Sequence, residues 1–200
     1  MPEPRSPGPD PASVAVLVPV KAFHQAKLRL AASLDAAARA ALAERMATTV
    51  LAAASPLPVW VVCDDDTVAS WATAAGAGVS WQPGRGLNDA VGAAVAEQAA
   101  AGVGRVIVAH GDLPLARELS WLVDPATPDE VVLVPDRRDD GTNVACLPSA
   151  AGFRFAYGAG SFGRHRAEAA RLGLPLRIER DAALGWDVDV PDDLTAVPDL

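Results

Sequence analysis

Three kinds of residue are scarce in this chain, and each scarcity excludes a class of protein. Lysine occurs only twice among 17 basic residues and the net charge is −8, which argues against a general nucleic-acid binder, because phosphate neutralisation needs a basic face. The two cysteines, Cys63 and Cys146, lie far apart without a CxxC pair, so we expect buried thiols and neither a disulfide framework nor a zinc cluster. Aromatic residues are few, and the five tryptophans are too dispersed for a stacking platform, which leaves core and interface roles.

Long hydrophobic runs are also absent. No stretch approaches the roughly 18 apolar residues of a membrane-spanning helix, so we expect no membrane partner. The first dozen residues, MPEPRSPGPDPA, are too rich in proline and charge for a secretory signal, and a cytoplasmic location is the default expectation. We therefore expect a disordered N-terminal arm over residues 1–13, followed by a single domain over residues 14–200.

The chain does contain a regular alternation of β-type apolar runs and alanine-rich segments of helical period. This alternation is typical of a wound α/β sheet, mostly parallel, with helices on both faces. In such a fold ligands bind beyond the carboxyl ends of the strands, so the loops after strands are where we expect the chemistry. The expected strands are 14–20, 59–63, 79–81, 103–109, 131–134, 143–147 and 176–178, and the expected helices are 34–54, 64–75, 86–101 and 162–172.

An acidic residue follows the strand at 103–109. The sequence HGDLP places Asp112 between a glycine and a Leu-Pro pair directly after an apolar run, where it suits a metal ligand. Mg²⁺ usually takes one or two protein carboxylates plus substrate phosphates. Asp187 and Asp189 in WDVDV would face the same side of an extended segment and converge on one ion, although a solvated acidic strand end explains the same pattern.

Both lysines fall in one loop after the first strand, VPVKAFHQAKLRLA. Compact ammonium groups are good partners for phosphate oxygens, so Lys21 and Lys27, together with Arg29, are candidates to bind an anionic ligand. Solvated surface residues that happen to cluster are an equally good interpretation. Arg137 and Arg138, in a later loop, are candidates either for a solvated face or for contact with pyrophosphate.

A second candidate site lies in YGAGSFGRH. Gly158 and Gly160 let the backbone approach a ligand closely, and Ser161 can cap the following helix while the helix amides face an anion. A phosphate or carboxylate cradle is one interpretation, and an ordinary strand-turn-helix with a serine cap is the other. Thr142 in DGTN adds a hydroxyl near the same edge of the sheet, where a plain turn is equally consistent. The three histidines are expected to pack or to hydrogen-bond, because imidazole is a poor ligand for Mg²⁺.

Six motifs, in this order along the chain, together resemble one enzyme family: VPVKAFHQAKLRL, GLNDAV, GDLPL, GTNVACL, YGAGSF and WDVDVPDDL. They are similar to the nucleotidyltransferases that make the activated phosphocarboxylic acid in coenzyme F420 biosynthesis, the 2-phospho-L-lactate and phosphoenolpyruvate guanylyltransferases. The resemblance covers residues 14–194 and implies a single-domain, three-layer, Rossmann-like nucleotide-diphospho-sugar transferase fold with a mostly parallel sheet. The first loop departs from the GxGxR pattern common in that superfamily, which makes a sugar-nucleotide or molybdopterin substrate less favoured.

The resemblance also implies a reaction and a set of residues. The reaction is attack by a substrate phosphate oxygen on the α-phosphorus of GTP, with release of pyrophosphate. Such a transfer needs positioning and charge neutralisation more than a covalent nucleophile, and Lys21 and Asp112 are therefore the expected catalytic residues. By similarity, two Mg²⁺ ions would be held by Asp112, Asp187 and Asp189, and the phosphocarboxylate by Thr142, Gly158 and Ser161 with Lys21 nearby.

The nucleotide is expected beside the turn QPGRGLNDAV. This turn would bring backbone amides and a side-chain amide toward the base and ribose, while Lys27 and Arg29 reach the phosphates. The residues expected to line the guanine and ribose pocket are Gly86, Leu87 and Asn88. A glycine turn in which Asn88 or Asp89 merely caps the helix is the alternative.

The acceptor is the least determined part of the prediction. Phosphoenolpyruvate is favoured because the arginine-rich, lysine-poor composition resembles GC-rich bacterial coding, and bacterial enzymes of this type are associated with that acceptor. The alternatives are 2-phospho-L-lactate, 3-phosphoglycerate, another nucleotidyltransferase such as a molybdenum-cofactor guanylyltransferase, and a non-catalytic subunit that keeps the fold. A labile product implies functional coupling to the deazaflavin transferase that consumes it, and a homodimer stays open.

Overall fold

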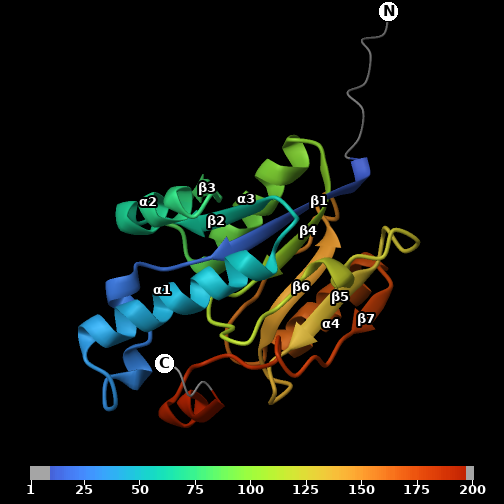
Figure 1. Cartoon of the computed structure of the whole chain (residues 1–200). Helices are drawn as coiled ribbons and strands as arrows, with labels where there is room; N and C mark the ends of the chain where they lie inside the picture. The colour runs from blue at the N-terminus through green and yellow to red at the C-terminus, as the bar shows by residue number, and fades with distance from the viewer. Residues whose placement is uncertain (1–9, 197–200) are drawn as a thin grey trace, which may run out of the picture.

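Seven strands form one sheet in the order β3-β2-β1-β4-β6-β5-β7 in the computed structural model, which describes residues 10–196 (Figure 1). Most of the expected strands and helices are present, with boundaries that shift by a few residues. The strands are β1 Asp10–Pro19, β2 Val59–Cys63, β3 Gly78–Trp81, β4 Val103–Ala109, β5 Val131–Pro135, β6 Thr142–Pro148 and β7 Leu176–Ile178. The helices are α1 Ala36–Ala53, α2 Asp66–Ala74, α3 Leu87–Ala100 and α4 Ser161–Leu172, with short 3-10 helices η1 Phe23–Gln25, η2 Leu28–Leu30, η3 Ser120–Leu122 and η4 Pro191–Ala196.

The sheet is mixed, and one strand accounts for the departure from parallel pairing. β1 pairs in parallel with β2 and β4, β2 with β3, and β5 with β7. β6 lies between β4 and β5 and runs antiparallel to both. Because β6 returns after the short loop 136–141, it brings its first residue, Thr142, to the same edge of the sheet at which β4 ends.

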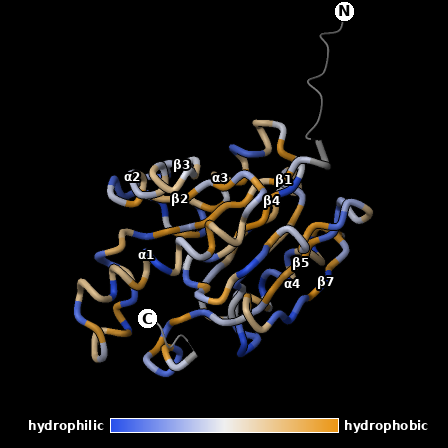
Figure 2. The backbone as a smooth tube through the Cα atoms, viewed as in Figure 1, coloured by the Kyte–Doolittle hydropathy of each residue, from blue (hydrophilic) through white to orange (hydrophobic). Residues whose placement is uncertain are grey.

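The sheet separates two hydrophobic layers, as the alternation predicts. Along β1, Val16 and Val18 pack with α1 and α2, whereas Leu17 packs with α3 and α4. This period of two is what a strand buried on both faces requires. Figure 2 shows hydrophobic residues along the central strands and hydrophilic ones mostly in loops and on outer helix faces. The three-layer α/β architecture is confirmed.

Two helix starts are fixed by aspartate side chains. The Asp35 carboxylate accepts from the Ala38 N–H at 2.8 Å to cap α1, and Asp65 accepts from Val68 N–H at 3.0 Å to cap α2. Such caps satisfy amide groups that the first helical turn leaves open. The acidic run after β2 is therefore a helix start.

The beginning of the chain differs from expectation. β1 starts at Asp10, which pairs with Val103, so residues 10–13 belong to the strand and not to an arm. The rest of the expected arm lies outside the described residues. Between residues 10 and 196, no helix has both the length and the apolar composition that crossing a membrane requires.

Candidate active site

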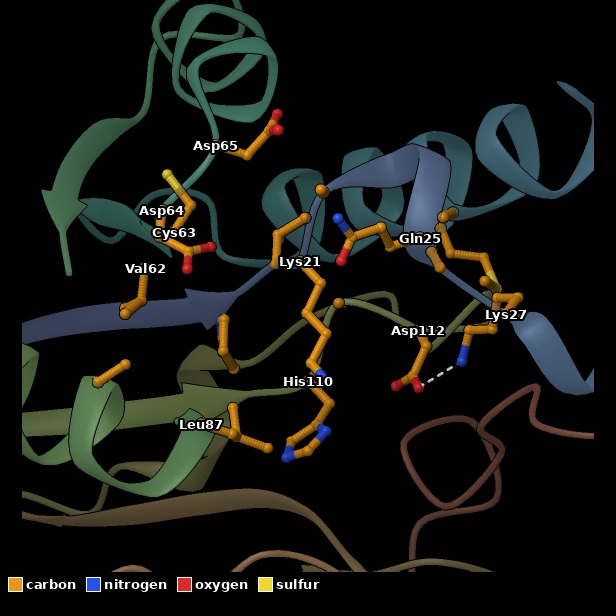
Figure 3. A pocket seen from close by; sticks show the side chains of 18 of the residues that line it. Lys21, Gln25, Lys27, Val62, Cys63, Asp64, Asp65, Leu87, His110 and Asp112 are labelled. Atoms are coloured by element: carbon orange, nitrogen blue, oxygen red, sulfur yellow. Dashed lines mark hydrogen bonds and ion pairs between the residues drawn. The ribbon is translucent and has the colours of Figure 1, made fainter. Parts of the chain in front are cut away.

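The carboxyl ends of β1 to β4 surround a cavity of about 720 Å³. Its walls are the loops that follow these four strands, as seen in Figure 3, together with residue 189 from the C-terminal segment. Its volume lies within the roughly 300–1,000 Å³ typical of ligand pockets. The polar and charged side chains that line it are Lys21, Gln25, Lys27, Arg29, Asp64, Asp65, Gln82, Arg85, His110, Asp112 and Asp189.

The three basic residues of the first loop all reach this cavity. Figure 3 shows Lys21 extending toward His110 at the end of β4. Lys27 stands where η2 begins, with a left-handed φ of 54°, and its side chain is only 11% exposed. Arg29 is 75% exposed at the rim. The loop therefore offers one nearly buried cation, Lys27, and two exposed cations, Lys21 and Arg29, to a ligand.

Lys27 forms ion pairs with two of the acidic residues that the sequence predicts to be metal ligands. Its Nζ lies 2.7 Å from Asp112 Oδ2 and 3.3 Å from Asp189 Oδ1. Burial alone would lower the pKa of Lys27, but the negative charges of Asp112 and Asp189 outweigh burial and raise it. For Asp112 burial alone would raise the pKa, but the charges of Lys27 and His110 and the hydrogen bonds to the carboxylate together outweigh burial and lower the pKa. The pair is therefore ionised at neutral pH.

Two acidic oxygens near this ion pair lack partners. Asp112 Oδ1 and Asp187 Oδ1 are buried, and no described residue donates a hydrogen bond to either. Burial raises the pKa of Asp187 to about 6, with a further contribution from the negative charge of Asp112. The N–H of Val188 donates to the Asp112 carbonyl at 3.3 Å, which holds the two acidic segments side by side. Such orphaned acceptors are rare inside proteins and call for a ligand.

These acids do not form a ready-made metal cage. In the part of the chain that the structure describes, no group of three or more His, Cys, Asp or Glu side chains is close enough together to hold a metal ion. Mg²⁺ nevertheless prefers carboxylate oxygens, and it uses one or two of them when substrate phosphates supply the remaining ligands. The open oxygens of Asp112 and Asp187 fit a cation that arrives with a phosphate-bearing substrate.

The second predicted cluster is assembled, but beside the cavity and not on its wall. Ser161 does not cap α4, because Gly160 occupies the N-cap position and the Ser161 Oγ instead accepts from the Thr142 N–H at 3.0 Å. Both side chains are buried, at 2% exposure. Gly158 and Gly160 adopt φ values of 112° and 72°, where a side chain would be strained. Thr142, Gly158 and Ser161 thus come together through backbone conformation and two hydrogen bonds, because the Ser161 N–H also donates to the Gly158 carbonyl at 3.0 Å.

A buried histidine fixes the orientation of the Thr142 hydroxyl. The N–H of Ala156 donates to His165 Nε2 at 2.9 Å, so the ring proton sits on Nδ1 and is donated to Thr142 Oγ1 at 2.9 Å. Burial lowers the pKa of His165 to about 4, which keeps the ring neutral. The Thr142 hydroxyl, having accepted this bond, keeps its own proton to donate to a ligand.

Asn88 is placed differently from the prediction. Its Oδ1 accepts from the N–H of Tyr157 at 2.6 Å, and it does not line the cavity, whereas Gly86 and Leu87 do. Asn88 therefore fastens the start of α3 to the turn that contains Gly158. Of the three residues of this turn that were predicted to bind the nucleotide, only Gly86 and Leu87 line the cavity.

Two cavity residues were not singled out for function from the sequence. Gln82 follows β3, is 4% exposed, and donates through Nε2 to Glu97 Oε1 at 2.6 Å and to Ser80 Oγ at 3.1 Å. His110 follows β4, and its ring packs on Tyr157 with centroids 4.6 Å apart. Both come directly after strands, so the rule that ligands bind beyond strand ends was the signal that would have found them.

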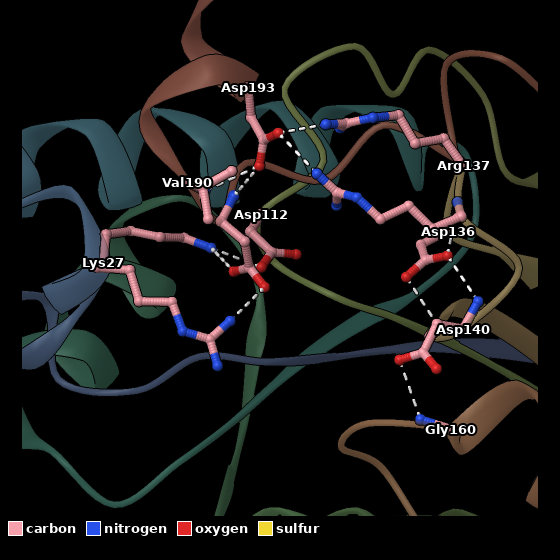
Figure 4. Close-up of polar contacts among 12 residues, drawn as sticks. Lys27, Asp112, Asp136, Arg137, Asp140, Gly160, Val190 and Asp193 are labelled. Atoms are coloured by element: carbon pink, nitrogen blue, oxygen red, sulfur yellow. Dashed lines mark hydrogen bonds and ion pairs between the residues drawn. The ribbon is translucent and has the colours of Figure 1, made fainter.

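The two arginines considered for pyrophosphate binding have a different partner. Arg137 and Arg138 both direct a guanidinium nitrogen at Asp193 Oδ1, and Asp193 is fully buried (Figure 4). Asp193 carried no prediction, because a second aspartate in PDD looks like part of a solvated acidic end. The partners of Asp193, Arg137 and Arg138, lie more than fifty positions away in the chain, so the local sequence does not show that Asp193 is buried and paired.

Comparison of the sequence with protein families and curated proteins gives a consistent result. The family described as "Guanylyl transferase CofC like" matches residues 14–197. A phosphoenolpyruvate guanylyltransferase from Sphaerobacter thermophilus is 38% identical over 184 residues, which cover 89% of each chain. A phosphoenolpyruvate guanylyltransferase from Conexibacter woesei is 38% identical over 197 residues, which cover 94% of this chain and 88% of the relative.

Solved structures agree on the fold at much lower sequence identity. A protein named as a nucleotide-diphospho-sugar transferase from Desulfovibrio desulfuricans superposes with a TM-score of 0.76 at 17% identity, covering 92% of this chain and 85% of that chain. A nucleotidyl transferase from Methanothermobacter thermautotroptrophicus gives a TM-score of 0.60 at 15% identity, covering 94% and 97%. These likenesses confirm the predicted fold class.

Proposed function

The chain belongs to the family of CofC-like guanylyl transferases, and from this premise we propose that it transfers the guanylyl group of GTP to the phosphate of phosphoenolpyruvate. The observation that carries the proposal is the Lys27–Asp112 pair, because it puts a cation and open acidic oxygens together in a nucleotide-sized cavity. The named relatives, at 33–38% identity, support the choice of acceptor.

The proposed reaction is a substitution at phosphorus. An oxygen of the acceptor phosphate attacks the α-phosphorus of GTP, the bond from that phosphorus to the bridging oxygen of the β-phosphate breaks, and pyrophosphate leaves with the electron pair. The product is enolpyruvoyl-2-diphospho-5'-guanosine. Because the attacking phosphate is already ionised, no general base has to remove a proton, and the protein's task is to bring anions together and offset their charge.

The nucleotide is proposed to lie in the cavity between the loops after β1 and β3. Gly86 and Leu87 lie on one wall, where the backbone at the N-terminus of α3 approaches the base and ribose. Lys27 and Arg29 would face the phosphates from the opposite loop. Lys21, which extends toward His110 (Figure 3), is placed to offset charge at the reacting phosphate.

The divalent cations, two Mg²⁺ ions by expectation, are proposed to bind Asp112, Asp187 and Asp189. A bound Mg²⁺ supplies charge neutralisation at the phosphates of both substrates. The structural support is the pair of unpartnered oxygens on Asp112 and Asp187. Lys27 contacts Asp112 through Oδ2 and Asp189 through Oδ1, which leaves Oδ1 of Asp112 open to a cation.

The acceptor is proposed to bind against Thr142, Gly158 and Ser161. The Thr142 hydroxyl has a proton to donate because His165 already donates to its oxygen. The positive φ of Gly158 exposes backbone that a side chain would cover. A phosphocarboxylate has two anionic ends, one for this cluster and one for the cation and Lys21.

The test is pyrophosphate release with GTP, Mg²⁺ and one acceptor at a time, with the deazaflavin transferase present to consume the labile product. The acceptors are phosphoenolpyruvate, 2-phospho-L-lactate and 3-phosphoglycerate. We expect turnover with phosphoenolpyruvate at least roughly tenfold above the other two, the discrimination that about 1.4 kcal/mol provides. Turnover with a different acceptor overturns the substrate assignment, and turnover with CTP but not GTP overturns guanylyl transfer.

The cellular setting is proposed from the substrates. GTP and phosphoenolpyruvate are cytoplasmic metabolites, so we place the protein in the cytoplasm, functionally coupled to the transferase that consumes its product. We also propose a homodimer, because Trp81 ends the edge strand β3 and is 43% exposed. Sedimentation of the wild type and of Trp81→Ser tests that assembly.

A further inference from the structure

Asp193 holds the acidic segment of the proposed metal site by its backbone. Asp193 Oδ2 accepts from the N–H of Asp189 at 2.7 Å and from the N–H of Val190 at 2.9 Å. The side chain is fully buried. Burial alone would raise the pKa of Asp193, but hydrogen bonds from Arg137 and from these two N–H groups outweigh it and hold the pKa at about 2.

The other oxygen of Asp193 fastens this segment to the rest of the fold. Arg137 and Arg138 both donate to Asp193 Oδ1, Arg138 at 3.3 Å (Figure 4). Arg137 also lies over the ring of Trp186 at 4.2 Å, and its N–H donates to the Gly185 carbonyl at 2.9 Å. The segment 185–193, which contains no regular helix or strand before η4, is thus shaped by contacts with the loop between β5 and β6.

That loop is itself rigid. Asp136 accepts from three of its N–H groups, those of Arg138 at 2.9 Å, Asp140 at 3.0 Å and Gly141 at 2.8 Å. A Cβ on Gly141 would lie 2.8 Å from Asp136 Oδ2, so the turn is closed too tightly for a side chain. On its far side Asp140 Oδ2 accepts from the Gly160 N–H at 3.0 Å. One loop therefore connects the acidic segment to the predicted acceptor cluster (Figure 4).

We propose that Asp193 is the positioning residue that sets Asp187 and Asp189 for a divalent cation, an inference that rests on the metal assignment in the proposed function. Mg²⁺ demands near-ideal octahedral geometry, so ligands on an irregular segment need an outside support. Asp193 supplies it by fixing the N–H groups of residues 189 and 190 and by tying them to Arg137 and Arg138. A role limited to fastening the C-terminal end of the chain is the competing explanation.

The test is Mn²⁺ binding to the full chain, followed by electron paramagnetic resonance in the presence of a non-hydrolysable GTP analogue. Asp193→Asn is compared with Asp192→Asn, which removes the same charge one position away from an exposed side chain. We expect Asp193→Asn to weaken Mn²⁺ binding by roughly 10–100-fold, the usual effect of removing a residue that orients metal ligands. Asp192→Asn should bind like the wild type. Asp187→Asn serves as the reference for a lost ligand.

Turnover gives a second readout that a fastening role would not change. Asp193→Asn should need about tenfold more Mg²⁺ for half-maximal rate and recover most of its kcat at saturating Mg²⁺, with an unchanged KM for phosphoenolpyruvate. Should Asp193→Asn fail to fold by circular dichroism, Arg138→Gln replaces it, since this variant removes a half-exposed partner and leaves Arg137 on the carboxylate. For Arg138→Gln we expect a smaller shift in the same direction.

The outcomes separate the two levels of inference. Wild-type Mn²⁺ affinity and Mg²⁺ dependence in Asp193→Asn, with binding lost in Asp187→Asn, leave the metal site in place and overturn the positioning role. Undiminished binding in Asp187→Asn overturns the metal assignment, and the positioning role with it. Normal cation binding without guanylyl transfer to any of the three acceptors overturns the proposed function alone.

Discussion

The ammonium of Lys27 lies 2.7 Å from Oδ2 of Asp112, although the two residues are 85 positions apart in the chain. The contact joins the loop after β1 to the loop after β4 at the bottom of the cavity. It compensates a buried carboxylate in the absence of any metal ion, and it places the same carboxylate where a phosphate-bound cation is proposed. The ion pair and the proposed cation site therefore share the carboxylate of Asp112.

Replacing Lys27 by methionine keeps the volume of the side chain and removes its charge. We expect kcat/KM for GTP to fall by roughly 100-fold or more, because a nearly buried positive charge near the phosphates contributes several kcal/mol to their stabilisation. The control is Arg117→Met, which removes an exposed positive charge from the loop after β4 outside the cavity. Equal losses of kcat/KM in the two variants would show that GTP responds to the overall charge of the protein and not to Lys27 in particular.

Asp112→Asn and Asp187→Asn should have the same effect on activity and opposite effects on stability. Both should lower turnover by roughly a thousandfold, because each removes a proposed ligand of the cation. In metal-free buffer at pH 8, Asp112→Asn should lower the free energy of unfolding by about 2 kcal/mol, since it leaves Lys27 without its shorter ion pair. Asp187→Asn should raise it by about 1 kcal/mol, because it removes the charge of a half-buried carboxylate whose Oδ1 has no hydrogen-bond partner.

Thermal unfolding in EDTA checks both stability changes, and pyrophosphate release checks both rates. Full activity in Asp187→Asn would exclude it from the cation site. A large loss of stability in Asp187→Asn would contradict the view that the buried charge of Asp187 destabilises the metal-free fold.

Stability should fall in mild acid because of His165. Its pKa is about 4 in the folded protein, where burial lowers it, and about 6.5 in the unfolded chain. Below pH 6.5 the unfolded chain takes up a proton that the folded protein does not, so this contribution to stability is complete above pH 6.5 and is lost as the pH falls toward 4. The expected loss is about 3 kcal/mol.

Urea unfolding between pH 4 and pH 8 measures this effect, with His165→Gln as the reference. The variant should be less stable at pH 7.5 but should show a shallower fall between pH 6.5 and pH 4. Parallel curves for the two proteins would mean that other groups cause the acid sensitivity.

Asn88→Leu distinguishes the observed placement of Asn88 from the predicted one. Because Asn88 Oδ1 bonds the Tyr157 N–H and not a cavity ligand, loss of this bond should loosen the turn that precedes Gly158. The KM for phosphoenolpyruvate should then rise by about tenfold, the effect of losing roughly 1.4 kcal/mol of binding, while the KM for GTP stays within about twofold. The reverse pattern would restore the nucleotide-binding role that the sequence predicts. Asp89→Ala, on the neighbouring exposed position, is the control.

Much of the fold is written in local sequence patterns. The apolar run at residues 103–109 predicts β4 with its observed ends, and the aspartate before α1 marks the helix start. These features depend on neighbours within a few residues, through side-chain alternation and amide capping. Lys27 and Asp112, from the loops after β1 and β4, both line the cavity, since strands of one sheet deliver their loops to a common edge.

The sequence alone could not decide which distant segments pair with one another. The antiparallel pairing of β6 with β4, the Ser161 hydroxyl bonding across to Thr142, and the burial of Asp193 beneath two arginines each depend on residues 19 to 56 positions away. A polar side chain in a turn has several partners of similar energy nearby, and only the packed fold decides which one it meets in a buried place. The sequence by itself determined the layers, the places of the strands and the types of residue in the loops after them. The tertiary structure decided which of those residues line the cavity and which hold the others in position, because burial makes an unmet hydrogen bond costly and so selects one arrangement.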